Sequence, residues 1–123
     1  MNQEEMKDRT KQFSLRVIRL VNALPKTVEG RAISGQLIRS GMSVGANYRA
    51  ACRSRSKIEF LSKLGTVEEE ADESAYWMEL IIESCMLNKD KVESLLREAN
   101  EITAIVAASK KTVKSSINRK SNM

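Results

Sequence analysis

Basic side chains that could bind phosphate groups are concentrated in two segments of this 123-residue chain. Residues 25–57 hold seven Lys and Arg residues and a single acid, Glu29, and the C-terminal segment has no acid after Glu101. Lys and Arg neutralise phosphates, so this pattern favours a nucleic-acid partner. The residues predicted to contact phosphates are Arg49, Arg53, Arg55, Lys110, Lys111 and Lys114.

Internal pairing is the alternative explanation for the first basic segment. Residues 58–87 carry eight acids and only one base, Lys63. Exposed ion pairs contribute only about 0–1 kcal/mol each, so such pairs would orient two helices more than stabilise them. The sequence leaves both explanations open for residues 25–57. For the C-terminal group, solvent-exposed positive charge is the expectation.

Residues that could perform catalysis or hold a metal are scarce. The chain has no His, which removes Ser–His and Cys–His nucleophilic pairs and the Glu-x-x-His motif of di-iron bundles. The acidic run at residues 68–73 would point its carboxylates in several directions around a helix, as a solvated face does. Cys52 and Cys85 match no metal or redox spacing. We therefore predict a non-catalytic protein without a metal or other cofactor.

The composition is that of a small globular protein with a mild basic excess. Hydrophobic residues make up 41% and charged residues 30%, and the net charge is +5. The length suits a single domain spanning residues 1–123. No stretch approaches the roughly 18 apolar residues of a membrane span, and residues 1–11 lack the apolar core of a signal peptide. We expect a cytoplasmic protein with no membrane partner.

Four segments show helical periodicity, with apolar residues at steps of three and four. Pro25 ends the first segment, because proline disfavours helical geometry in the residue before it. Ser56 and Glu59 form a capping-box pattern that starts the third near Lys57. The first predicted helix spans residues 4–24, and the second starts between residues 27 and 34 and ends at 52. The third spans residues 57–85 and the fourth about 92–113. Joined by short loops, they predict an all-α fold, an antiparallel up-down four-helix bundle.

The third segment has the clearest core pattern, and Glu68 interrupts it. A partly buried carboxylate needs a cationic or amide partner. Arg39 and Asn47 of the second segment are the candidates, which would form a structural polar network with Glu68; alternatively, Glu68 turns to the edge of the core. The predicted core positions are Leu61, Leu64, Glu68, Ala71, Ala75, Met78, Ile82 and Cys85.

The second segment is unusually rich in small residues. Glycine inside a helix costs about 1 kcal/mol relative to alanine, so its glycines need a structural reason. Close approach of another backbone is the natural one, and it would also suit contact between bundles. The small residues are Ser34, Gly35, Ser40, Gly41, Ser43, Gly45, Ala46 and Ala50.

Three stretches resemble a family of four-helix bundle proteins first noticed as open reading frames in intervening sequences of bacterial large-subunit ribosomal RNA. The resemblance spans residues 13–114. It is most specific at Ser43–Asn47 and at the Tyr76–Trp77 pair. The three stretches are Arg39–Ser56, Phe60–Gly65 and Glu68–Leu80.

The resemblance implies an up-down bundle that assembles into a ring, typically a homopentamer. It also implies a relation to the accessory proteins of diversity-generating retroelements, which associate with a reverse transcriptase and with nucleic acid. Many family members carry an acid where this chain has Ala50. The family has no catalytic residues to transfer, and most of its members have no settled function.

Two functional hypotheses follow. The first is a non-catalytic, oligomeric nucleic-acid-binding accessory protein whose partner is RNA in preference to DNA. The alternative is a protein-binding scaffold ring that recruits a partner enzyme such as a reverse transcriptase.

Overall fold

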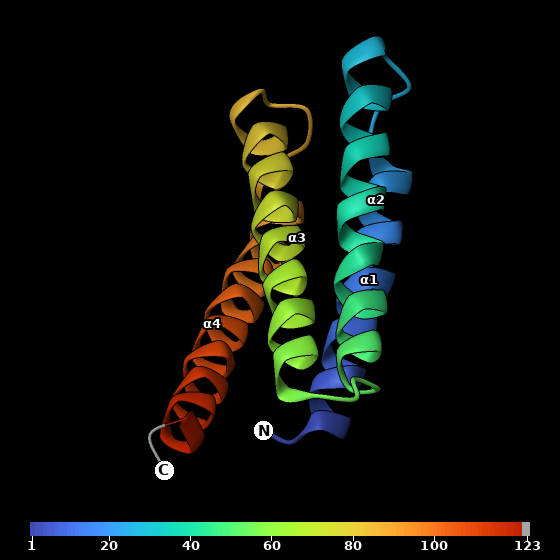
Figure 1. Ribbon diagram of the computed structural model, residues 1–123. Coiled ribbons are helices and arrows are strands. Elements are labelled where there is room, and N and C mark those ends of the chain that lie inside the picture. The colour runs from blue at the N-terminus through green and yellow to red at the C-terminus, as the bar shows by residue number, and fades with distance from the viewer. Residues whose placement is uncertain (122–123) are drawn as a thin grey trace.

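The computed structural model is a bundle of four long helices with a short 3₁₀ turn before the last one (Figure 1). It describes residues 1–121, and side chains as far as Arg119. No strand occurs within residues 1–121, and none of the helices there is both long and apolar enough to cross a membrane. The elements are α1 (Gln3–Ala23), α2 (Val28–Ala51), α3 (Lys57–Glu83), η1 (Lys89–Lys91) and α4 (Glu93–Ser121).

Each helix packs mainly on its neighbours in the sequence: α1 on α2, α2 on α3, and α3 on α4. Contact between α1 and α4 is much smaller. In Figure 1 the chain runs up and down, α4 leans away from α2, and both termini lie at the lower end. The antiparallel four-helix bundle predicted from the sequence is confirmed.

Side-chain caps define where three of the helices begin. Asn2 Oδ1 accepts a hydrogen bond from Glu5 N at the start of α1, and Thr27 Oγ1 accepts one from Gly30 N at the start of α2. Ser56 Oγ accepts from Glu59 N at 3.0 Å, as the capping box predicts. The Glu59 carboxylate accepts in return from the backbone N–H of residue 55. The predicted starts of α2 and α3 are thus confirmed.

The buried face of α3 is as wide as the predicted one but is rotated from it. Val67 and Ile81 are fully buried, whereas Ile82 is partly buried and Glu68 lies at the edge of the core, which is the second alternative that the sequence left open. Cys85 lies beyond the helix, is exposed, and has a φ of 58°. The reason is that α3 packs against α2 on one side and α4 on the other, and these two contacts together determine which face is buried. The buried residues are Leu64, Val67, Ala71, Ser74, Ala75, Met78 and Ile81.

The small residues of α2 allow α1 to pack closely against it. A Cβ atom on Gly41 would lie 2.6 Å from Val17 Cγ1, and one on Gly45 would lie 3.2 Å from the Thr10 carbonyl oxygen. Gly35, in contrast, has open space around it. The predicted close approach is therefore confirmed, but at Gly41 and Gly45 the neighbour is α1 of the same chain and not another bundle.

Candidate nucleic-acid interface

The up-down topology brings the two basic segments to the same end of the bundle (Figure 1). The last turn of α2, the α2–α3 turn, the start of α3 and the C-terminal part of α4 all lie there. The Lys57 ammonium group donates a hydrogen bond to Ser116 Oγ, which joins the start of α3 to the end of α4. We call the exposed cations of this region the basic end. They are Arg49, Arg53, Arg55, Lys57, Lys111, Lys114 and Arg119.

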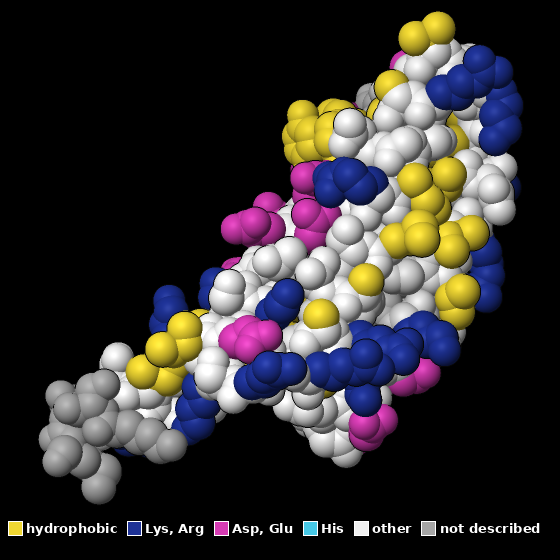
Figure 2. All heavy atoms as spheres, turned by 45° about the vertical axis from the view of Figure 1, so that its right-hand side comes forward, with side chains coloured by type: hydrophobic (Ala, Val, Ile, Leu, Met, Phe, Trp, Pro, Cys, Tyr) yellow, Lys and Arg dark blue, Asp and Glu magenta, His cyan; other side chains and the backbone are white. Residues whose placement is uncertain are grey.

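The side chains of the basic end are free of acidic partners. None of the seven forms an ion pair with a described residue of the chain. Figure 2 shows Lys and Arg side chains forming a band across the lower part of the face that α1 and α2 turn to the viewer. Their charge is therefore available to an external partner.

The six predicted phosphate contacts surround this end but do not form one flat patch. Arg49 and Arg53 line a groove between α1 and α2, whereas Lys111 and Lys114 project from α4, which packs on α3. Arg55 lies in the turn between these two groups.

Lys110 differs from the other five predicted contacts because it has an acidic partner. Its Nζ lies 2.8 Å from Glu68 Oε1, and both side chains are half-buried between α3 and α4. Its charge is therefore largely neutralised by Glu68 within the bundle.

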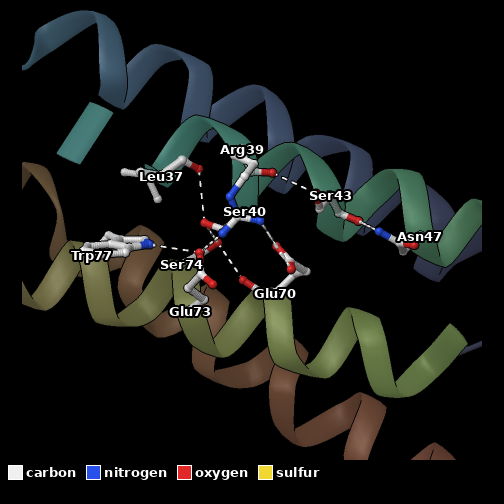
Figure 3. Close-up of polar contacts among 9 residues, drawn as sticks. All are labelled: Leu37, Arg39, Ser40, Ser43, Asn47, Glu70, Glu73, Ser74 and Trp77. Carbon is white, nitrogen blue, oxygen red and sulfur yellow. Dashed lines mark hydrogen bonds and ion pairs between the residues drawn. The ribbon is translucent and has the colours of Figure 1, made fainter. Parts of the chain in front are cut away.

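The predicted polar network of Arg39, Asn47 and Glu68 does not form. Arg39 pairs with Glu70 and Glu73, at 3.1 Å between Nη1 and Glu70 Oε2, while Asn47 Nδ2 donates to the Ser43 carbonyl (Figure 3). The reason is the turn of about 100° per helical residue: Glu68 faces α4, and the carboxylates two and five residues later face α2. Of the basic residues in 25–57, Arg39 is thus the one ion-paired to α3.

A buried hydroxyl pair next to Arg39 was not predicted. Ser74 Oγ donates to Ser40 Oγ at 2.9 Å and is also 2.8 Å from the Glu70 carbonyl oxygen, and Ser40 Oγ lies 3.3 Å from the Leu37 carbonyl (Figure 3). Both serine side chains are fully buried. The only signal in the sequence was a serine inside each apolar face, which does not show that the two would meet.

Two titratable groups near the basic end are shifted by burial. Desolvation raises the pKa of the Tyr48 phenol to about 12. Burial also raises the pKa of the Cys52 thiol, so this cysteine keeps its proton at neutral pH. Neither group is prepared to act as a nucleophile or a base.

Carboxylates and thiols do not gather into a metal site. Among the described residues, no three His, Cys, Asp or Glu side chains are placed to hold one ion together. The acidic residues of α3 instead divide between Arg39, Lys110 and solvent.

A groove runs between α1 and α2. Its volume is about 580 Å³. Ile18, Met42, Gly45 and Ala46 provide the apolar part, and Met42 is 50% exposed. The polar part is formed by Glu4, Lys7, Asp8, Lys11, Ser14, Arg49, Cys52 and Arg53.

Comparison with known proteins identifies similar chains. Residues 2–108 match the family model described as 23S rRNA-intervening sequence protein. A crystal structure from Bacteroides thetaiotaomicron VPI-5482, described as a protein with unknown function from the S23 ribosomal protein family, superposes with a TM-score of 0.83. It is 32% identical, and the match covers 90% of this chain and 99% of that one. No curated protein matches.

Proposed function

The chain belongs to the 23S rRNA-intervening sequence protein family, and from this premise we propose that it is a non-catalytic accessory protein that binds nucleic acid as a homo-oligomer. One observation carries the proposal: seven exposed Lys and Arg side chains share one end of the bundle without acidic partners. The preferred partner is RNA, in keeping with the ribosomal RNA in the family's description.

Phosphate groups are the part of the nucleic acid that this surface suits. Unpaired ammonium and guanidinium groups displace condensed counterions from phosphates, which gives affinity that falls steeply with salt and depends weakly on sequence. Arg53, Arg55, Lys111 and Lys114 are placed to do this, and Lys110 contributes less because Glu68 holds it.

The low aromatic content favours a structured RNA over an unpaired strand. Proteins that bind single strands stack bases on exposed aromatic rings. The chain has five aromatic residues, and of these Phe60 lies beside Arg55 and Lys57 at the basic end. Double-stranded RNA is recognised mainly through its shape, phosphates and 2′-hydroxyls, for which cations suffice.

A binding role also agrees with the chemistry available. The chain has no His to act as a general base, and the Cys52 thiol stays protonated. The family description names no reaction.

A pair of charge-reversal variants tests the proposal. K111E/K114E removes two cations from the basic end, and K89E/K91E makes the same change in net charge on η1 at the other end of the bundle. We expect the first to weaken binding of a structured RNA by about tenfold or more and the second by much less. We also expect the wild type to bind this RNA more tightly than a duplex DNA of matched length.

Two results would contradict the proposal. One is equal loss in both variants, which would mean that only net charge matters. The other is a wild-type protein that binds no nucleic acid even at low salt. That second result would favour the protein-binding scaffold that recruits a partner enzyme.

A further inference from the structure

The α1–α2 groove has the features of a site for a helix. Its α1 wall extends from Glu4 to Ile18, which corresponds to about 21 Å of helix. An elongated hollow between two parallel ridges with an apolar floor is the shape that accepts an amphipathic helix. If only phosphate groups bound in this groove, the exposed Met42 side chain would remain in contact with water.

The groove also carries a net positive charge, because its α2 wall holds two arginines and no acid, whereas the two lysines of its α1 wall are balanced by Glu4 and Asp8. Lys7 and Lys11 come from α1, and Arg49 and Arg53 come from α2. Of these four, Lys7 is the one with an acidic partner, at 2.7 Å from Glu4. The helix that fits this groove should therefore carry carboxylates.

The chain itself presents such a helix face. Five exposed residues at steps of three and four form a straight stripe on the outer side of α3, and four of them are acids. The central one, Tyr76, is 53% exposed, and none of the four carboxylates forms an ion pair with a described residue. We call this the α3 stripe: Glu69, Asp72, Tyr76, Glu79 and Glu83.

The groove and the α3 stripe match in length and in charge. The stripe covers fourteen residue steps, about 21 Å of helix, as the α1 wall of the groove does. Four carboxylates would meet a groove lined by four cations and two acids, and Tyr76 would cover part of the apolar floor. Because α2 packs between α1 and α3, the stripe cannot reach the groove of its own chain.

We propose that the α1–α2 groove of one copy receives the α3 stripe of a second copy. The contact uses two different surfaces, so it is heterologous, and repetition leads to a ring or an open chain. This inference rests on the homo-oligomer of the proposed function and supplies its surfaces. It assigns Arg49 and Arg53 to the contact between copies, which takes Arg53 away from the phosphate contacts named above, and leaves Arg55, Lys111 and Lys114 to nucleic acid.

Complementary charge swaps test this contact. The groove variant K11E/R49E has an acidic groove and an acidic stripe, and the stripe variant D72K/E79K/E83K has a basic groove and a basic stripe. Each variant alone should therefore lose assembly, since like charges would meet at every contact. A 1:1 mixture should recover assembly, because each groove then meets a stripe of opposite charge.

The measurements are sedimentation velocity at micromolar protein without nucleic acid, and native mass spectrometry of the mixture. We expect an assembled wild type, two monomeric variants, and a mixture whose assemblies alternate the two chains. The five-fold variant K11E/R49E/D72K/E79K/E83K should assemble alone, and K89E/K91E should behave as the wild type. Circular dichroism should show the same helix content in every variant.

Several outcomes would overturn the inference. A monomeric wild type would leave the groove to a different partner. If a variant with only one surface changed still assembled, the contact would lie elsewhere. The same would follow if both variants were folded but their mixture stayed monomeric. Nucleic-acid binding is measured separately with K111E/K114E, which should assemble normally, so failure of the contact and failure of the proposed function can be distinguished.

Discussion

Replacing Gly41 by alanine should destabilise the bundle, although alanine is the better helix former. The new Cβ would lie 2.6–2.9 Å from three atoms of Val17. Val17 is fully buried and β-branched, so its side chain has little freedom to move away. Overpacking of this kind costs about 1–3 kcal/mol. The helix propensity gained is about 1 kcal/mol, so a net loss of up to about 2 kcal/mol is expected.

Gly35→Ala provides the matched control on the same helix. A Cβ at Gly35 meets no atom within 4 Å, so only the gain in propensity remains. We expect this variant to be more stable than the wild type by about 0.5–1 kcal/mol.

Urea unfolding followed by the fluorescence of Trp77 measures both changes. The protein concentration must be held constant, because association adds to apparent stability. The double variant V17A/G41A should be less destabilised than the sum of its single changes by about 1 kcal/mol. If G41A proved as stable as G35A, the close packing of α1 on α2 would be refuted.

Three further predictions concern buried or half-buried polar groups. Arg9 donates two hydrogen bonds of 2.7 Å to Glu98, and this lowers the pKa of that carboxyl. The resulting stability is present above the ordinary pKa of 4.5 and is lost as pH falls. E98Q should therefore lower the free energy of unfolding by about 1 kcal/mol at pH 7. It should also make the loss of stability in acid smaller, as measured by urea titrations from pH 7 to 3. S40A or S74A alone should lower the free energy of unfolding by about 1 kcal/mol in the same assay. The double variant should lower it by less than the sum of the two single changes, because it leaves neither hydroxyl without its partner. Absorbance at 295 nm should show the Tyr48 phenol ionising near pH 12, and Y48F should remove that transition.

The fold was predictable because its signals are local. Pro25, the Thr27 cap and the Ser56–Glu59 capping box act within a few residues, and the structure places the helix ends there. The up-down order followed from the short connections. It also determines that two basic segments far apart in the sequence share one end.

The side-chain partners were not predictable because they depend on how each helix is rotated about its axis. A shift of one or two residues around α3 separates Glu68, which meets Lys110, from Glu70, which meets Arg39. That rotation results from the packing of α3 against two helices at once, which no single periodic pattern records. The close neighbour of Gly41 could not be identified for the same reason.

The dependence of RNA affinity on salt tests the central claim most directly. Each phosphate contact of a cation contributes about 0.7–0.9 to the slope of log K against log salt. We predict a steep negative slope for the wild type, a slope shallower by about 1.4–1.8 for K111A/K114A, and an unchanged slope for K89A/K91A. A wild-type affinity that does not change with salt, or equal slopes in all three proteins, would contradict the assignment of the basic end to nucleic acid.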